Sequence, residues 1–235
     1  MKPEIMKCPL PELSLPAGST VTIVSDRVSP GNIFYPTGFI LDPKVADQLL
    51  VQDIRVGRNS QLMGIGGIPA SLFSAARSPI KIRLEAITSG FAISLKVVNT
   101  GPPVIFSGSV VGSSRKPASV LSMVLGWGNT EVKTSATIIV YCQYDFEPQR
   151  LFVPPQVLKD FDIEYLQGEK YLDSSEVSKV PPDMLTATSI SDKGGSIHFE
   201  PISKVGRGTS LTIAVLNRAK SSRCFNAAVL GIPLE

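Results

Sequence analysis

The chain has 235 residues, of which 43% are hydrophobic and 18% are charged, and its formal net charge at pH 7 is +3. This composition excludes a largely disordered chain. The small positive charge comes from scattered Lys and Arg residues, which excludes the basic stripe of a dedicated nucleic-acid binder. We therefore expect a folded protein that contacts other protein and no sequence-specific nucleic acid.

The first 18 residues lack the uninterrupted apolar stretch of a signal peptide, because Pro3, Pro9, Pro11 and Pro16 divide them. No segment has the roughly 18 consecutive apolar residues of a membrane-spanning helix. We expect synthesis in the cytoplasm and a free N-terminal arm over residues 1–18.

Short, β-branched apolar runs bounded by Gly, Pro, Ser or Asn predict an all-β fold. Residues Thr20 to Ser25 and Ile80 to Ile87 alternate in the manner of half-buried strands. Asp42 and Pro43 predict a short helix through Leu50, with Asp42 as the N-cap. A counterpart is expected over residues 155–160, so each half of the chain carries at most one short helix.

One sequence pattern occurs twice. Gly90 to Asn99 is followed by Phe106 and Gly112, and Gly208 to Asn217 is followed by Phe225 and Gly231. In both copies the Gly-to-Asn spacing is nine residues and the Phe-to-Gly spacing is six, and the copies lie 118 to 119 residues apart. Repetition at a fixed distance indicates a duplicated domain.

Glycine tolerates positive φ and asparagine forms hydrogen bonds to nearby backbone, so both suit turns. We interpret six residues of the repeated pattern as structural turn positions: Gly90, Asn99, Gly112, Gly208, Asn217 and Gly231.

Weaker correspondences lie upstream in the same order. They are Thr20–Val24 with Ala136–Val140, Phe39–Pro43 with Leu151–Pro155, Gly57 with Gly168, and Ile68–Phe73 with Val180–Leu185.

The two copies are separated by residues 112–119, which have the composition of a linker. We predict a first β-sandwich over residues 1–115 and a second over 116–235. Each has about eight strands, which suits a jelly-roll-type sandwich of two four-stranded sheets. Residues 173–183 are expected to form a longer loop in the second copy.

The search for reactive groups predicts no enzyme, no cofactor and no metal site. His198 is the single histidine, and one imidazole cannot form a histidine-rich metal site. The glycine-rich segment 63–69 lacks the lysine of a phosphate-binding loop. Two carboxylate pairs are interpreted as solvated loop charges: Asp160 with Asp162, and Asp173 with Glu176.

Three cysteines, Cys8, Cys142 and Cys224, have neither metal-ligand nor redox spacing. We expect free thiols in a protein made in a reducing compartment.

Two fused eight-stranded sandwiches, carried by the duplicated patterns Gly90–Gly112 and Gly208–Gly231, resemble the double jelly-roll major capsid proteins of tailless, membrane-containing bacteriophages. The resemblance implies a structural virion protein, of which three copies form a pseudo-hexagonal capsomer of an icosahedral shell. Implied partners are neighbouring capsomers, other virion proteins and a viral membrane beneath the shell. Arg115 and Lys116 are candidate contacts between subunits.

Two other functions stay open at this point. The first is a non-enzymatic binding module, such as a phage spike, fibre or decoration protein or a carbohydrate-binding pair. Binding of glycans by the monomeric protein would support this function. The second is a hydrolase or isomerase, which would require His198 to lie in a cleft against Glu200 or a cysteine.

Overall fold

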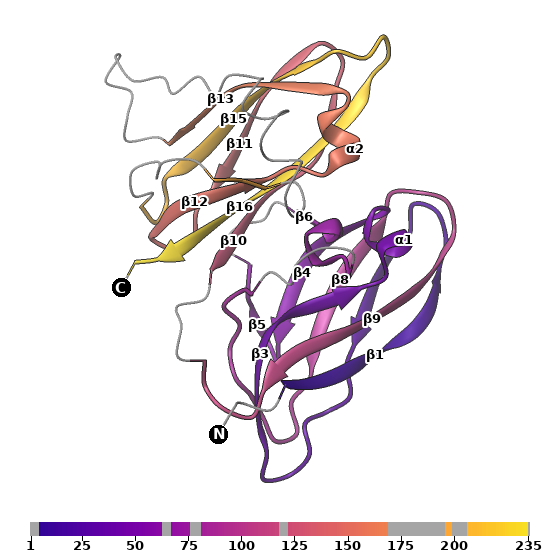
Figure 1. The fold of residues 1–235 in the computed structure, drawn as a ribbon, viewed down its shortest axis with the longest axis vertical. Helices are drawn as coiled ribbons and strands as arrows, with labels where there is room; N and C mark the ends of the chain where they lie inside the picture. Colours follow the sequence, from indigo (N-terminus) through magenta and orange to yellow (C-terminus); the bar gives the residue numbers. More distant parts are fainter. Residues whose placement is uncertain are drawn as a thin grey trace. The chain divides into compact units, whose positions relative to one another are not determined.

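The computed structural model describes residues 5–62, 67–75, 81–117, 122–168, 196–198 and 206–234. The chain divides into two compact units, residues 1–62 with 69–122, and residues 63–68 with 123–235. Strands dominate both units (Figure 1). No helix in the described residues is long and apolar enough to cross a membrane.

The elements of the first half of the sequence are β1 (Ile5–Leu15), β2 (Thr20–Val24), β3 (Ile33–Leu41), α1 (Pro43–Ala46), β4 (Leu49–Val56), β5 (Asn59–Ser60), β6 (Ile68–Pro69), the 3-10 turn η1 (Ala70–Phe73), β7 (Ile87–Thr88), β8 (Ile93–Asn99) and β9 (Val104–Ser113). Those of the second half are β10 (Met123–Val132), β11 (Ser135–Tyr141), β12 (Phe146–Phe152), α2 (Pro155–Leu158), β13 (Phe161–Gly168), β14 (Ser196–His198), β15 (Ser210–Asn217) and β16 (Arg223–Pro233).

The first unit has the strand order of a jelly roll. One sheet runs β1-β9-β3-β7 and the other β2-β8-β4-β5, and the neighbours along both orders pair antiparallel. The short strand β6 also pairs with β4. The first strand therefore pairs with the last, and the chain passes between the two sheets as it proceeds. This arrangement defines the jelly-roll form of the sandwich.

The second unit repeats that order with its own strands. Its sheets are β10-β16-β12-β14 and β11-β15-β13 within the described residues. Each strand takes the place of a strand of the first unit, so that β10 replaces β1 and β16 replaces β9 (Figure 1). The predicted all-β fold of two jelly-roll-type sandwiches is confirmed.

The irregularities of the sheets also recur. Each unit has a register shift in its first strand, a shift in its third strand and a shift in its fourth strand, at matching distances from the repeated pattern. An inserted residue bends and twists a strand locally, so a shared set of bulges indicates a shared backbone course. The shifts lie at Leu10/Leu13 and Trp127/Thr130, at Pro36/Gly38 and Pro148/Arg150, and at Val51/Asp53 and Ile163/Tyr165.

Strand register corrects two of the sequence correspondences by one residue. Thr20 lies opposite Val98 and Ser135 lies opposite Leu216, so Thr20 corresponds to Ser135 and not to Ala136. Likewise Gly57 follows β4, whereas Gly168 is the last residue of β13. A slip of one residue exchanges the two faces of a strand, which similarity of β-branched residues alone does not detect.

Within the N-terminal arm expected over residues 1–18, Ile5–Leu15 form the edge strand β1, which pairs with β9 on both sides of a bulge. Pro9 and Pro11 lie within it. An edge strand tolerates proline because only one of its sides must donate to a neighbour.

The strand predicted over residues 80–87 is largely absent from the described part, residues 81–87. Ile82 is buried but forms only an isolated bridge, and the regular strand β7 begins at Ile87. Ala86, which the alternation would place on the same face as Ile82, is exposed. The alternation of apolar and charged residues therefore describes an extended segment without a continuous ladder partner.

The two short helices occur where the sequence predicted them, although both are shorter. In α1 the Asp42 carboxylate accepts a hydrogen bond from the Lys44 N–H at 2.8 Å, and Pro43 is the first helical residue. The helix ends at Ala46 because Leu49 already begins the buried strand β4. The 3-10 turn η1 was not expected.

Each sandwich encloses its own apolar core. Phe106 and Phe225, the aromatic residues of the repeated pattern, are both completely buried. Phe225 contacts Phe161 edge to face with 5.3 Å between ring centroids. Such pairs add about 0.5–1.5 kcal/mol beyond the burial of area.

Gly112 and Gly231, which come six residues after these phenylalanines, lie inside strands and not in turns. This corrects our interpretation of both as turn positions. Gly112 in β9 lies between Met6 and Pro36, and Gly231 in β16 lies between Met123 and Pro148. A Cβ at Gly112 would lie 2.3 Å from the Tyr35 carbonyl oxygen. The glycine is needed for close approach of the neighbouring strand.

Gly112→Ala is therefore expected to destabilise the first unit by about 1–3 kcal/mol, because the new methyl group overlaps with backbone that must move. The measurement is the free energy of unfolding in denaturant. Ser109→Ala, at a half-exposed position of the same strand, is the control and should change it by less than about 0.5 kcal/mol.

Candidate functional site

The two asparagines of the repeated pattern are buried side chains at strand ends. Asn99 is the last residue of β8 and is completely buried, and Asn217 is the last residue of β15 and is 7% exposed. We expected them to follow the strands as turn residues. Their burial instead places both amide groups where every polar atom needs a partner.

Each amide binds the same set of backbone groups. The Asn99 Nδ2 donates to the carbonyl oxygens of Leu15, Pro16 and Pro102 at 3.0, 3.1 and 2.8 Å. Its Oδ1 accepts from the Gly101 N–H at 3.0 Å. The side chain thus joins the end of the first strand to the turn between the last two strands.

In the second unit the Asn217 Nδ2 donates to the carbonyl oxygens of Val132, Lys133 and Ser221 at 2.9, 3.1 and 2.9 Å. Its Oδ1 accepts from the Ala219 N–H at 2.9 Å. We call each of these four-bond arrangements an asparagine clamp. The two clamps use the same donor and acceptor atoms at the same strand ends, and they differ only in the turn, where the acceptor lies three residues after Asn99 and four residues after Asn217.

The remaining turn positions behave as the chemistry of glycine predicts. Gly90 and Gly208 have φ values of 83° and 79°. At both positions a Cβ would meet no atom within 4 Å, so φ and not space requires glycine.

Two arginines of the second unit form ion pairs with carboxylates at its surface. Arg218 lies 3.4 Å from Asp162, and Arg223 lies 3.3 Å from Asp160. Arg218 also donates to the Leu158 carbonyl oxygen at 3.0 Å. These two carboxylates, expected to be solvated loop charges, therefore help to hold α2 and β13 against the turn between β15 and β16.

The structure describes no reactive site at the candidate catalytic and metal-binding residues. His198 lies in β14 opposite Arg150, and nothing is described of its side chain. Glu200, Asp173 and Glu176 lie outside the described residues. Within the described segments no three metal-binding side chains come together.

The three cysteines are free thiols with different surroundings. Cys142 is 2% exposed, and burial raises the pKa of its thiol from 9.0 to about 12. Burial also raises the pKa of Cys8, and a hydrogen bond with Ser25 opposes this increase. Cys224 is exposed.

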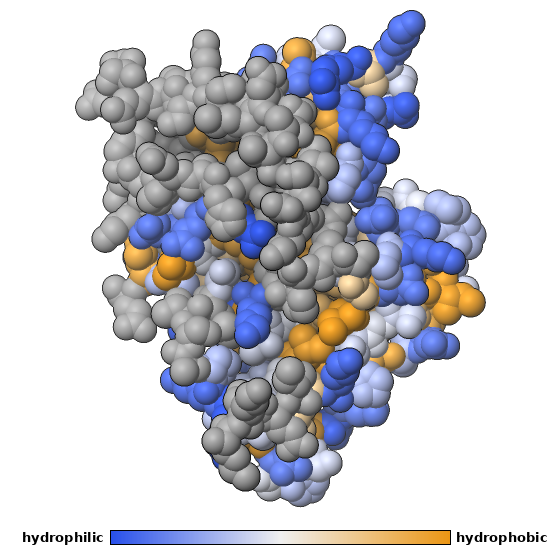
Figure 2. Space-filling model, in the orientation of Figure 1, coloured by the Kyte–Doolittle hydropathy of each residue, from blue (hydrophilic) through white to orange (hydrophobic). Residues whose placement is uncertain are grey.

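Exposed apolar side chains occur on both units, and two of them occupy the same position of the repeated frame. Val24 on β2 is 49% exposed and Ile139 on β11 is 53% exposed. Val24 lies opposite Ser94 and Ile139 opposite Thr212, so their registers correspond. Figure 2 shows apolar surface interrupting the polar surface of each unit.

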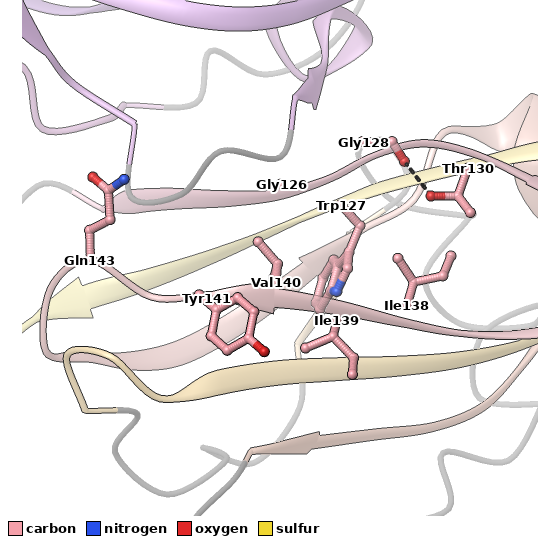
Figure 3. A pocket seen from close by; sticks show the side chains of 9 residues that line it. All are labelled: Gly126, Trp127, Gly128, Thr130, Ile138, Ile139, Val140, Tyr141 and Gln143. Atoms are coloured by element: carbon pink, nitrogen blue, oxygen red, sulfur yellow. Dashed lines mark hydrogen bonds between the residues drawn. The ribbon is translucent and has the colours of Figure 1, made fainter.

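Trp127, the only tryptophan of the chain, is 1% exposed. It stands beside Ile138 and Val140 of β11 at a pocket of about 430 Å³ (Figure 3). No site was predicted at this residue from the sequence. The flanking pattern Gly-Trp-Gly inside an apolar strand was the available signal.

A search of solved structures finds similarity to the crystal structure of the major capsid protein P2 from Bacteriophage PM2. The match covers 99% of this chain and 98% of that chain, with a TM-score of 0.49 and 10% sequence identity. A scan of protein-family models and a search of curated proteins find no match.

Replacing either clamp asparagine is expected to destabilise its own unit. Asn217→Ala removes four hydrogen bonds, one buried and three partly buried, and should lower the free energy of unfolding by about 2–4 kcal/mol. Asn217→Asp should cost more at pH 7, because a carboxylate would face three carbonyl oxygens. Burial raises the pKa of such a carboxyl group above its unfolded value, so stability should recover in part as the pH falls.

The measurement is denaturant unfolding of both variants between pH 4 and pH 7, with Asn226→Ala as the control. Equal stability of wild type and Asn217→Ala would show that the clamp does not hold the fold.

The buried thiol of Cys142 predicts a loss of stability at alkaline pH. The unfolded chain releases this proton near pH 9.0, whereas the folded chain holds it to about 12. Between those values stability should fall by up to about 1.4 kcal/mol per pH unit. Cys142→Ala should remove this component of the slope in unfolding experiments, whereas Cys224→Ala should leave it unchanged.

Proposed function

We propose that this chain is a structural shell protein of a virion, and that three copies form a pseudo-hexagonal capsomer. One observation carries the proposal: the same jelly-roll frame is built twice in one chain, down to the bulges and the asparagine clamps. Jelly rolls are a recurrent architecture of viral capsids.

Duplication has a geometric consequence for assembly. Three chains with two similar units each supply six similar blocks, and a ring of six blocks closes while using only threefold symmetry. Closed rings of repeated contacts are the normal form of homo-oligomers. A chain with two unlike domains would not offer six similar blocks.

A ring of this kind needs comparable contact surfaces on both units. Val24 and Ile139 supply one, because each presents an exposed apolar side chain at the same place of the frame. Exposed apolar groups stabilise protein contacts when they are covered. Arg115 and Lys116 are exposed after β9, and their role as contacts between subunits stays a prediction.

In this role the protein would be made in the host cytoplasm and would end in the virion. Its partners would be neighbouring capsomers and other virion proteins. Contact with a membrane beneath the shell is part of the same proposal.

The mass of the purified chain in solution tests the proposal. We expect a trimer, or a larger assembly in multiples of three, by size-exclusion chromatography with light scattering. The double variant Val24→Glu with Ile139→Glu should shift the population toward the monomer, because charges would become buried in the contact.

Ser29→Glu with Ser221→Glu is the matched control, since it adds the same charge at exposed loop positions of both units. A wild-type chain that stays monomeric at high concentration would contradict the shell role and favour a binding module.

A further inference from the structure

The second unit contains an apolar pocket between two strands that belong to different sheets. The pocket has a volume of about 430 Å³ and lies between β10 and β11 (Figure 3). Both strands are at the edges of their sheets. Ligand sites commonly have volumes of about 300–1,000 Å³. Among the residues that the structure describes, no charged side chain lines it; the described lining residues are Gly126, Trp127, Gly128, Thr130, Ile138, Ile139, Val140, Tyr141 and Gln143.

A buried hydrogen-bond donor lies at this pocket without a partner. The Nε1 of Trp127 has no hydrogen-bond acceptor within the described part of the chain, although the residue is only 1% exposed. Buried indole N–H groups usually have a partner, and one without an acceptor costs about 1–3 kcal/mol. The indole lies among Ile138, Ile139 and Val140, which line the same pocket (Figure 3).

The jelly-roll frame does not require this arrangement, because the first unit has other residues at the corresponding positions. Leu10 lies opposite Gly108 in the register where Trp127 lies opposite Ala227. Pro9 corresponds to Gly126 in the same way. The tryptophan and its flanking glycine thus distinguish the second unit from the first within an otherwise shared backbone.

We propose that the Trp127 pocket binds an uncharged, mainly aliphatic molecule that carries a carbonyl oxygen. The aliphatic part would contact Ile138 and Ile139, and the carbonyl oxygen would accept a hydrogen bond from the Trp127 Nε1. An apolar lining with few polar groups that fix orientation is typical of small-molecule sites. This activity goes beyond the shell role, and Ile139 belongs both to the pocket lining and to the proposed contact surface between subunits.

The test uses octan-2-one as the probe and the single indole N–H as the reporter. Because the chain has one tryptophan, a ¹⁵N-correlated NMR spectrum contains one indole Nε1–H signal. We expect a saturable downfield shift of this signal as octan-2-one is added, since a new hydrogen bond deshields the proton. Trp127→Phe should weaken binding at least about fivefold, as seen from the ligand signals.

Two exposed positions give a matched pair of variants that spare the core. Ile139→Ser shortens a lining side chain and should weaken binding about three- to tenfold. Val24→Ser changes the corresponding position of the first unit and should leave binding unchanged. The proposal is overturned if the indole signal does not move up to the solubility limit of the ketone, or if Ile139→Ser binds as well as wild type.

Discussion

The whole structure depends on one interaction made twice, the buried asparagine clamp. In each unit a single amide holds the end of the first strand against the turn between the last two strands. This is where a jelly roll must close, because its first and last strands are neighbours although they lie far apart in sequence. Buried carbonyl groups at that junction need a donor, and the asparagine supplies it.

The clamps explain why the repeated sequence pattern survives where the rest of the two copies has diverged. A residue that satisfies four backbone bonds at once cannot be exchanged without loss of several of them. The phenylalanine and the glycine of the pattern are required for other reasons. Phe225 fills the core of its unit, and Gly112 allows the neighbouring strand to approach closely. Residues outside these constraints, such as Leu10 and Trp127, could change and acquire new roles.

Much of the fold could be predicted from the sequence because it depends on local chemistry. Alternating β-branched residues indicate strands, and Asp42 with Pro43 indicates the start of a helix. Register could not be predicted, since Thr20 aligns as well with Ala136 as with its true counterpart Ser135. The clamps and the Trp127 pocket depend on contacts between distant strands, so the sequence showed only a repeated asparagine and an isolated tryptophan.

Electron microscopy of the assembled protein tests most directly whether twin jelly rolls act as building blocks of a shell. The account predicts rings of six similar lobes formed by three chains. Isolated two-lobed particles at all concentrations, or rings whose lobes are not six, would contradict it.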